Sequence, residues 1–276
     1  MPGTTRARRW LLNAVALLAA LFFAFPVYWM FITAFKPAGQ IQTYVPVFLP
    51  SPTLDNFVKA VSVPHFTDFL RNSVLIAGVT LTAALVVGFL TAATLARARI
   101  RGRKGFLLLV AIAQMAPFEA LLIPFFLVMR DAGLYNQLPS LVIVYIIFTL
   151  PFTIWSLRGF IAGIPVDLEE SAMVDGCSRV GAFVRVTLPL LGPGLVATAI
   201  FCFITAWNEY FYAFVFMTDV QNYTLPVWLA TFRTNFGTDW GATMAASTLF
   251  TLPVLLFFLV VQGRMVGGLT TGAVKG

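Results

Sequence analysis

Residues 165–176 read Pro165-Val-Asp-Leu-Glu169-Glu170-Ser171-Ala172-Met-Val-Asp175-Gly176, and the chain then runs to Leu188-Pro189 before it becomes apolar again. Four acidic residues fall within nine positions of this segment. Apolar runs at 139–161 and 190–217 lie on either side, and each is long enough to cross a bilayer. Because lipid cannot solvate so acidic a connection, this pattern indicates an aqueous loop and a docking surface.

The composition places the whole chain in a membrane. Of 276 residues, 59% are hydrophobic and 11% are charged, whereas a soluble domain carries roughly a quarter charged residues. A bilayer core needs about 20 apolar helical residues to span it. We therefore predict an all-α polytopic protein with six transmembrane helices, forming one membrane domain over residues 1–276. The predicted spans lie at about 10–35, 71–96, 105–129, 139–161, 190–217 and 241–263.

The positions of Lys and Arg predict the orientation of these spans. Thirteen basic residues fall on the side that carries both termini: Arg6, Arg8, Arg9, Arg97, Arg99, Arg101, Arg103, Lys104, Arg158, Arg179, Arg185, Arg264 and Lys275. Five fall on the other side: Lys36, Lys59, Arg71, Arg130 and Arg233. The positive-inside rule then puts both termini in the cytoplasm. The net charge of +7 thus reflects topology in lipid rather than a nucleic-acid partner. The first apolar run is too long for a signal peptide, so we expect it to be retained.

Few residues could carry chemistry. Cys177 falls in the acidic loop, Cys202 within a span and His65, the single histidine, in an outer loop. This distribution predicts neither a disulfide scaffold nor a metal site. The sequence contains no G-x-x-x-x-G-K-[ST] motif. If ATP drives this protein, another subunit must bind it.

The acidic loop has the local signals of two short helices. Asp167 and Glu170 have the spacing of a capping box, and Gly176 is placed to end the first helix. Ser178 can cap a second helix, which we expect to break at the residue before Pro189. Two helices bent about a glycine suit insertion into a groove of another protein. The alternative is that both helices lie on the bilayer surface.

The spacing of this loop resembles the EAA motif of ATP-binding-cassette (ABC) importer permeases. The matching residues are Glu170-Ser171-Ala172, then Gly176, then Val186-Thr187-Leu188-Pro189, with Ser171 and Val186 as small departures. Residues 35–37, 49–57, 72–73, 207–209 and 268–276 are similar to carbohydrate-uptake permeases of the maltose-transporter type, specifically to the shorter, six-helix partner of the permease pair.

This resemblance implies a type I ABC importer fold and a non-catalytic subunit of a sugar importer in a bacterial or archaeal plasma membrane. The expected partners are a second, different permease, two copies of a cytoplasmic ATPase that binds ATP and Mg²⁺, and an extracytoplasmic sugar-binding protein. No cofactor is expected in this chain. The loop at 165–189 would couple to the ATPase, with Glu170 pairing with a basic residue there. The coupling residues are Glu169, Glu170, Ser171, Ala172, Asp175, Gly176, Leu188 and Pro189.

Two ionisable residues, Glu119 and Glu209, fall near the bilayer midplane, about 15 Å from the outer ends of their spans. Helical spacing continues a polar stripe along the fifth span through Thr198, Cys202, Thr205, Glu209 and Tyr212. The candidate substrate path comprises Glu119, Thr205, Asn208, Glu209 and Tyr212. The alternative is that these groups hold helices together by hydrogen bonds. Glu119 and Glu209 could also relay protons in a secondary carrier, which would need no docking loop; a non-transporting scaffold is a third alternative.

Overall fold

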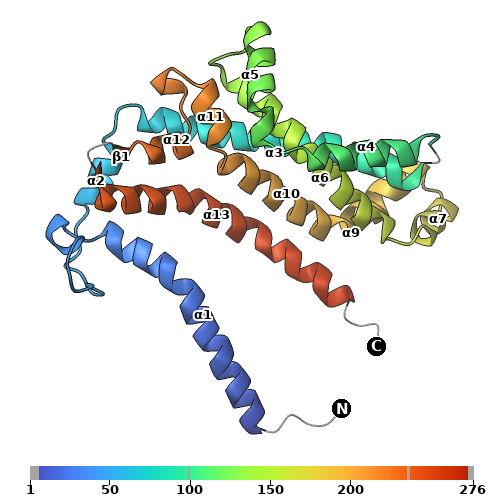
Figure 1. Ribbon diagram of the computed structural model, residues 1–276. Helices are drawn as coiled ribbons and strands as arrows, with labels where there is room; N and C mark the ends of the chain where they lie inside the picture. Colours follow the sequence, from blue (N-terminus) through green and yellow to red (C-terminus); the bar gives the residue numbers. More distant parts are fainter. Residues whose placement is uncertain (1–5, 99, 235–236, 273–276) are drawn as a thin grey trace. The chain divides into compact units, whose positions relative to one another are not determined.

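The structure, a computed structural model, describes residues 6–98, 100–234 and 237–272 (Figure 1). The chain divides into two compact units, which are described separately. The first comprises Met1–Phe66 and Leu229–Pro253, and the second comprises Thr67–Trp228 and Val254–Gly276. Helices dominate both units, as the composition predicts.

The first unit contains one long apolar helix and its following loop. Its elements are α1 (Arg6–Ala34), η1 (Ala38–Gln40), α2 (Asp55–Val61), β1 (Arg233–Thr234), β2 (Gly237–Thr238) and the first part of α13 (Trp240–Gly272). Strands β1 and β2 form a small antiparallel pair. The buried Asn56 amide donates hydrogen bonds to the carbonyls of Ala34 and Lys36 at 3.0 and 2.7 Å, which fixes the turn after α1.

The second unit is a helical bundle that contains the acidic loop. Its elements are α3 (Phe66–Arg97), α4 (Arg103–Met115), η2 (Glu119–Leu121), α5 (Leu122–Asp131), α6 (Leu138–Ala162), α7 (Asp167–Val174), α8 (Arg179–Ala182), η3 (Phe183–Thr187), α9 (Leu188–Leu190), α10 (Gly192–Trp207), α11 (Phe211–Phe216), η4 (Val220–Asn222) and α12 (Leu225–Ala230). Helices α4 and α10 both pack against α6. The close approach of α3 to α6 needs a glycine, because a Cβ on Gly88 would lie 2.3 Å from Cγ2 of Thr153.

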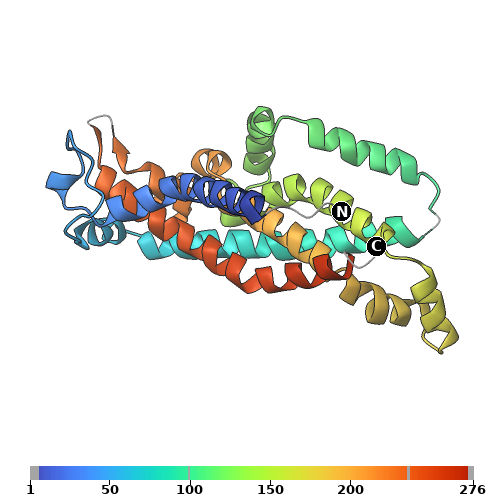
Figure 2. The same cartoon turned by 90° about the horizontal axis from the view of Figure 1, so that it is seen from below.

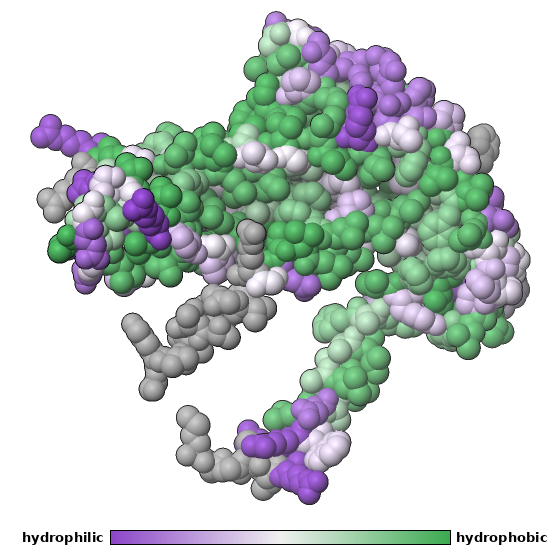
Figure 3. All heavy atoms as spheres, turned by 180° about the vertical axis from the view of Figure 1, so that it is seen from behind, coloured by the Kyte–Doolittle hydropathy of each residue, from purple (hydrophilic) through white to green (hydrophobic). Residues whose placement is uncertain are grey.

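Among the residues that the structure describes, five helical segments are long and apolar enough to cross a membrane: Arg8–Ala34, Phe66–Arg97, Leu138–Ala162, Gly192–Phe216 and Trp240–Gly263. Their outward surfaces are apolar, and hydrophobic residues cover most of the face seen in Figure 3. Such a surface suits lipid or another membrane helix. Three of the basic residues used to predict the orientation are affected by the limits of the described residues: Arg99 and Lys275 lie outside them, as does the side chain of Arg264. The end of the tail at 268–276 also lies outside them.

The third predicted span is broken rather than continuous. Helices α4 and α5 meet at 88° across the residues between Met115 and Glu119 (Figures 1 and 2). Ala116 adopts an extended conformation, which is the usual preference before a proline such as Pro117. Pro124 lies in the first turn of α5, where its missing N–H has no helical partner to lose. The predicted number of six spans therefore holds only if this bent pair is one span.

The fifth predicted span also contains an interruption. Helix α10 ends at Trp207 and α11 begins at Phe211, so the segment from Asn208 to Tyr210 separates two helices. The expected continuous polar stripe is thus wrong in its geometry. Thr198 and Cys202 are buried and face α6, where their side chains lie 3.1 Å from Ser156 Oγ and 3.2 Å from Thr153 Oγ1 respectively.

Candidate functional site: the loop between α6 and α10

The acidic loop is a bent pair of short helices, as its sequence predicts. Helix α7 ends in a Schellman motif, in which the N–H of Cys177 bonds to the carbonyl of Ala172 and the N–H of Gly176 bonds to that of Met173. This motif requires a left-handed residue, and Gly176 has φ of +90°. The predicted capping box is wrong, because the N-cap of α7 is Val166 and not Asp167, so the helix begins one residue earlier than expected. The N–H of Glu170 accordingly bonds to the carbonyl of Val166.

The second half of the loop is helical for longer than expected. The Ser178 hydroxyl accepts a hydrogen bond from the N–H of Gly181 and caps α8, as predicted. The expected break at Leu188 is wrong, because the chain stays helical through η3, a π-helical turn, and into α9. The N–H of Leu188 bonds five residues back to Phe183, and this wider turn makes room for Pro189.

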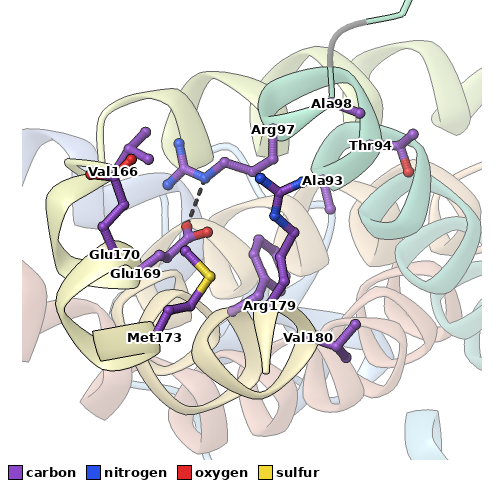
Figure 4. Close-up of a pocket in the computed structure, with 11 residues that line it drawn as sticks. Ala93, Thr94, Arg97, Ala98, Val166, Glu169, Glu170, Met173, Arg179 and Val180 are labelled. Atoms are coloured by element: carbon purple, nitrogen blue, oxygen red, sulfur yellow. Dashed lines mark hydrogen bonds and ion pairs between the residues drawn. The ribbon is translucent and has the colours of Figure 1, made fainter. Parts of the chain in front are cut away.

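Glu169 is buried and ties the loop to a membrane helix. Its Oε1 accepts hydrogen bonds from Nε of Arg97, the last residue of α3, at 2.7 Å and from the Thr187 hydroxyl at 2.5 Å. Arg97 Nη2 also donates to the carbonyl of Ile164 at 3.0 Å, just before α7. Figure 4 shows Arg97 and Glu169 pointing toward each other across a pocket of about 320 Å³. One carboxylate therefore joins α3, α7 and η3.

The rest of the loop has an exposed surface that mixes charge with apolar groups, and Glu170 and Val180 of this surface also line the pocket beside Arg97. Glu170 and Asp175 are exposed acids, while Val174 and Val180 are 88% and 74% exposed. Ser171 is also exposed, and its hydroxyl donates a hydrogen bond to the carbonyl of Asp167 within α7. Exposed valines of this kind, beside carboxylates, form a surface that could bury apolar area against a partner. Of the remaining predicted coupling residues, Ala172 and Leu188 are half-buried and Pro189 is exposed.

The candidate path residues divide into buried and exposed groups. The buried Glu209 carboxylate accepts hydrogen bonds from the Tyr145 hydroxyl and from the N–H groups of Tyr212 and Ala213. It thus binds the first turn of α11, where helix N–H groups have no intrahelical partners. Tyr212 is buried beside it. This geometry is that of a structural anchor at the interruption in the fifth span.

The exposed candidates lie at the two interruptions. Glu119 is exposed in η2, at the break between α4 and α5. Asn208 is exposed immediately after α10. Thr205 is half-buried and lines a hollow together with Gln114 and Phe118. These three side chains have polar atoms available to a substrate, whereas Glu209 uses both carboxylate oxygens within its own chain.

Comparison with known proteins identifies the family. Residues 84–271 match the family described as the binding-protein-dependent transport system inner membrane component. The chain belongs to this family of ABC transporter permeases. The permease is 47% identical over 265 residues to the permease protein of a diacetylchitobiose uptake system from Streptomyces coelicolor, with 96% of each chain covered. It is 35% identical to the trehalose/maltose transport permease of Thermococcus litoralis, with 98% of each chain covered.

Solved structures show the same fold. A bacterial ABC transporter that imports the acidic polysaccharide alginate has a chain that aligns with the permease at a TM-score of 0.77, with 24% identity over 95% of this chain and 99% of that chain. An inward-facing methionine ABC transporter aligns at a TM-score of 0.62, with 18% identity over 75% of this chain and 99% of that chain. These likenesses establish the type I ABC importer fold, which serves more than one substrate class.

The family assignment settles several expectations. The permease is a non-catalytic, multi-pass component of an inner membrane, as predicted. The proton-carrier alternative has no support, because the family works with binding proteins.

Sequence reasoning missed one residue of the site altogether and misjudged another. Arg97 contributed only to the count of cytoplasmic positive charge, and Thr187 appeared only as one position of the EAA-like spacing. The sequence signal that could have found them is chemical: Glu169 directly precedes the exposed acid Glu170 on a short helix. Adjacent helical residues point about 100° apart, so one of two neighbouring carboxylates can turn toward the chain, and a buried carboxylate needs a partner there.

Proposed function

We propose that this protein is one of two different permease subunits of an ATP-driven carbohydrate importer. The observation that carries this proposal is identity along almost the whole chain to permeases named for diacetylchitobiose and for trehalose or maltose uptake. The importer would also contain two cytoplasmic ATPase subunits, which bind ATP and Mg²⁺, and an extracytoplasmic sugar-binding protein. In support, a related alginate transporter has been solved in complex with a periplasmic protein loaded with an alginate pentasaccharide.

The loop at 165–189 is the proposed point of contact with the ATPase. Its exposed side presents Glu170, Asp175, Val174 and Val180, and its fold is fixed by the bend at Gly176. Glu170 can pair with a basic residue while the valines bury apolar area. Closure of the two ATPases on ATP would push this surface and tilt the membrane helices, which alternates access to the path.

The proposed substrate path of this subunit uses the polar groups exposed at the helix interruptions. Interrupted helices commonly mark substrate sites in transporters, because their free backbone groups and side chains face a cavity. Glu119, Thr205 and Asn208 offer carboxylate, hydroxyl and amide groups that can bond sugar hydroxyls. Glu209 and Tyr212 would shape the path by holding the interruption in place rather than by touching sugar.

The function is tested by reconstitution. The complex of both permeases and the ATPase is placed in proteoliposomes with its sugar-binding protein, and uptake of radiolabelled trehalose, maltose and N,N′-diacetylchitobiose is measured. We expect uptake of at least one sugar that requires ATP and the binding protein and is abolished by vanadate. Uptake that persists without ATP and collapses with a protonophore would contradict the proposal.

The coupling loop is tested by substitutions at its bend. Gly176→Val forces a β-branched residue into a left-handed backbone and should abolish sugar-stimulated ATP hydrolysis, whereas Gly176→Asn should retain it, since Asn tolerates this conformation. Glu170→Ala should weaken binding of the ATPase subunit. Normal stimulated hydrolysis in both Gly176→Val and Glu170→Ala would show that the loop is not the coupling element.

A further inference from the structure

We propose that Arg97 is a positioning residue of the coupling step, which transmits movement of the loop directly to α3 through Glu169. This inference rests on the proposed function of the loop. It assigns Glu169 a role different from that of Glu170: Glu170 faces outward, while Glu169 faces inward and binds its own chain.

The contacts form a clamp, defined here as Arg97, Glu169 and Thr187 with the carbonyl of Ile164. Arg97 uses two different nitrogens, Nε toward Glu169 and Nη2 toward Ile164, at 2.7 and 3.0 Å. The planar guanidinium therefore grips α7 and the connection that precedes α7 at the same time. Thr187 adds a contact from η3 to the same carboxylate oxygen. A charge-assisted set of this kind is strong and directional.

The clamp adds a charged link between α7 and α3 to an apolar contact that the loop already makes with α3, in which the rings of Phe183 in η3 and Phe89 in α3 lie with centroids 5.9 Å apart. Helix α7 packs mainly on α8 and η3, which belong to the same loop. Below the clamp, an apolar core of Ala92, Leu157, Ile161 and Leu191 joins α3, α6 and the start of α10. A push on the loop can thus reach α6 and α10 along the chain itself and α3 through the contact of Phe183 with Phe89, while Arg97 connects α7 to α3 directly. Since α3 is 32 residues long, or about 48 Å, a force at its end acts on a long lever.

Burial makes the two charges interdependent. Glu169 is 6% exposed, and its partner guanidinium is mostly covered. A carboxylate in such a place is stable only with its counter-ion, so removal of either charge leaves the other unpaired. The clamp therefore stays closed as the loop moves, and α3 moves with it.

A double-mutant cycle in the reconstituted complex tests this role. The variants are Arg97→Gln, Glu169→Gln, their combination and the milder Thr187→Val. The control is Arg101→Gln, which changes an exposed arginine in the segment between α3 and α4. The measured quantity is the ratio of sugar-stimulated to basal ATP hydrolysis in complexes first shown to be assembled by size-exclusion chromatography. Binding of the ATPase subunit is measured in parallel, because a clamp that acts within the permease should leave it unchanged.

We expect Arg97→Gln and Glu169→Gln each to lower the ratio at least about fivefold, as expected for loss of one charge-assisted hydrogen bond. The combined variant should lose no more than either single one, since the two residues act as a unit. The proposal would be overturned by ratios within twofold of the unsubstituted complex, or by losses that multiply in the combined variant. It would also be overturned if the variants assembled poorly but the complexes that did assemble had a normal ratio. If Glu170→Ala still uncouples the complex in those cases, the proposed function of the loop stands without the clamp.

Discussion

The Tyr212 hydroxyl donates a hydrogen bond to the backbone carbonyl of Phe118 at 2.8 Å. This contact joins the break between α4 and α5 to the interruption between α10 and α11. The rings of Phe118 and Tyr212 also lie against each other, with centroids 4.6 Å apart. Two interrupted spans are therefore joined to each other at their breaks, and Glu209 holds one of them by accepting a hydrogen bond from the N–H of Tyr212.

Removal of the Tyr212 hydroxyl should weaken the junction between the two interruptions while the contact between the rings of Tyr212 and Phe118 remains. We expect Tyr212→Phe to lower the stability of the permease by about 1 kcal/mol, because the Phe118 carbonyl loses its side-chain donor while the ring packing is kept. Thermal unfolding of the purified complex in detergent measures the change. Tyr210→Phe serves as the control, since Tyr210 is half-buried and mainly stacks on Phe214. Equal effects of the two substitutions would argue against the junction.

Glu209 should act on stability and assembly rather than on the choice of sugar. In Glu209→Gln the amide nitrogen must face an N–H or O–H donor, so we expect a loss of about 1–3 kcal/mol from an unsatisfied buried group. The yield of assembled complex and the relative uptake of the three sugars are compared with those of Asn208→Ala. We expect Asn208→Ala to assemble normally and to raise the half-saturating sugar concentration. Normal assembly with altered sugar preference in Glu209→Gln would place its carboxylate in the path.

The packing of α3 on α6 predicts different outcomes for two glycines on one helix. Gly88→Ala should cost about 1–3 kcal/mol, because its new methyl group would overlap Thr153. Gly78→Ala should be neutral or slightly stabilising, since a Cβ there meets no atom within 4 Å. Thermal unfolding of the complex again gives the comparison. The combination of Gly88→Ala with Thr153→Ser removes the overlapping methyl group and should recover part of the loss; no recovery would mean that the overlap is not the cause.

The two native cysteines can test the predicted orientation. Cys177 is partly exposed beside the bend, whereas Cys202 is buried within the fifth span. A membrane-impermeant maleimide should therefore label Cys177 in inverted vesicles and leave it unlabelled in intact cells. Cys177→Ala should abolish the labelling, and Cys202→Ala should not change it. Labelling of Cys177 from outside the cell would reverse the predicted placement of the loop and of both termini.

Local sequence signals predicted the bend of the acidic loop, because this bend depends on residues next to each other in the sequence. Gly176 adopts the left-handed backbone, and Ser178 caps the next helix, as their types and positions indicate. We expected a break at Leu188 because Pro189 prevents ordinary α-helical hydrogen bonding. The structure instead keeps the backbone hydrogen-bonded through a π-helical turn, and the helix continues. Preferences of single residues cannot distinguish these two solutions.

The interruptions of the spans depend on contacts between distant residues. Pro117 lies at the break between α4 and α5, but only Tyr212, which is 94 residues from Phe118, shows how the freed backbone there is used. The interruption after Trp207 has no proline or glycine within it, so hydropathy extended one helix through it. The sequence predicts Glu209 near the bilayer midplane, but its hydrogen bonds follow from α11, whose first turn it binds. Arg97 was counted as charge because its partner is 72 residues distant.

The π-helical turn at η3 affects the direction in which the first helix of the acidic loop, α7, faces. Such a turn accommodates one residue more than an α-helical turn would, and each helical residue accounts for about 100° of rotation. Deletion of a single residue from 183–187 would restore regular pairing and swing α7 about the helix axis by roughly that angle. Glu170 would then be turned away from its proposed contact with the ATPase, and Glu169 would lose Arg97. The length of this short stretch is thus as strictly constrained as any side chain that it carries.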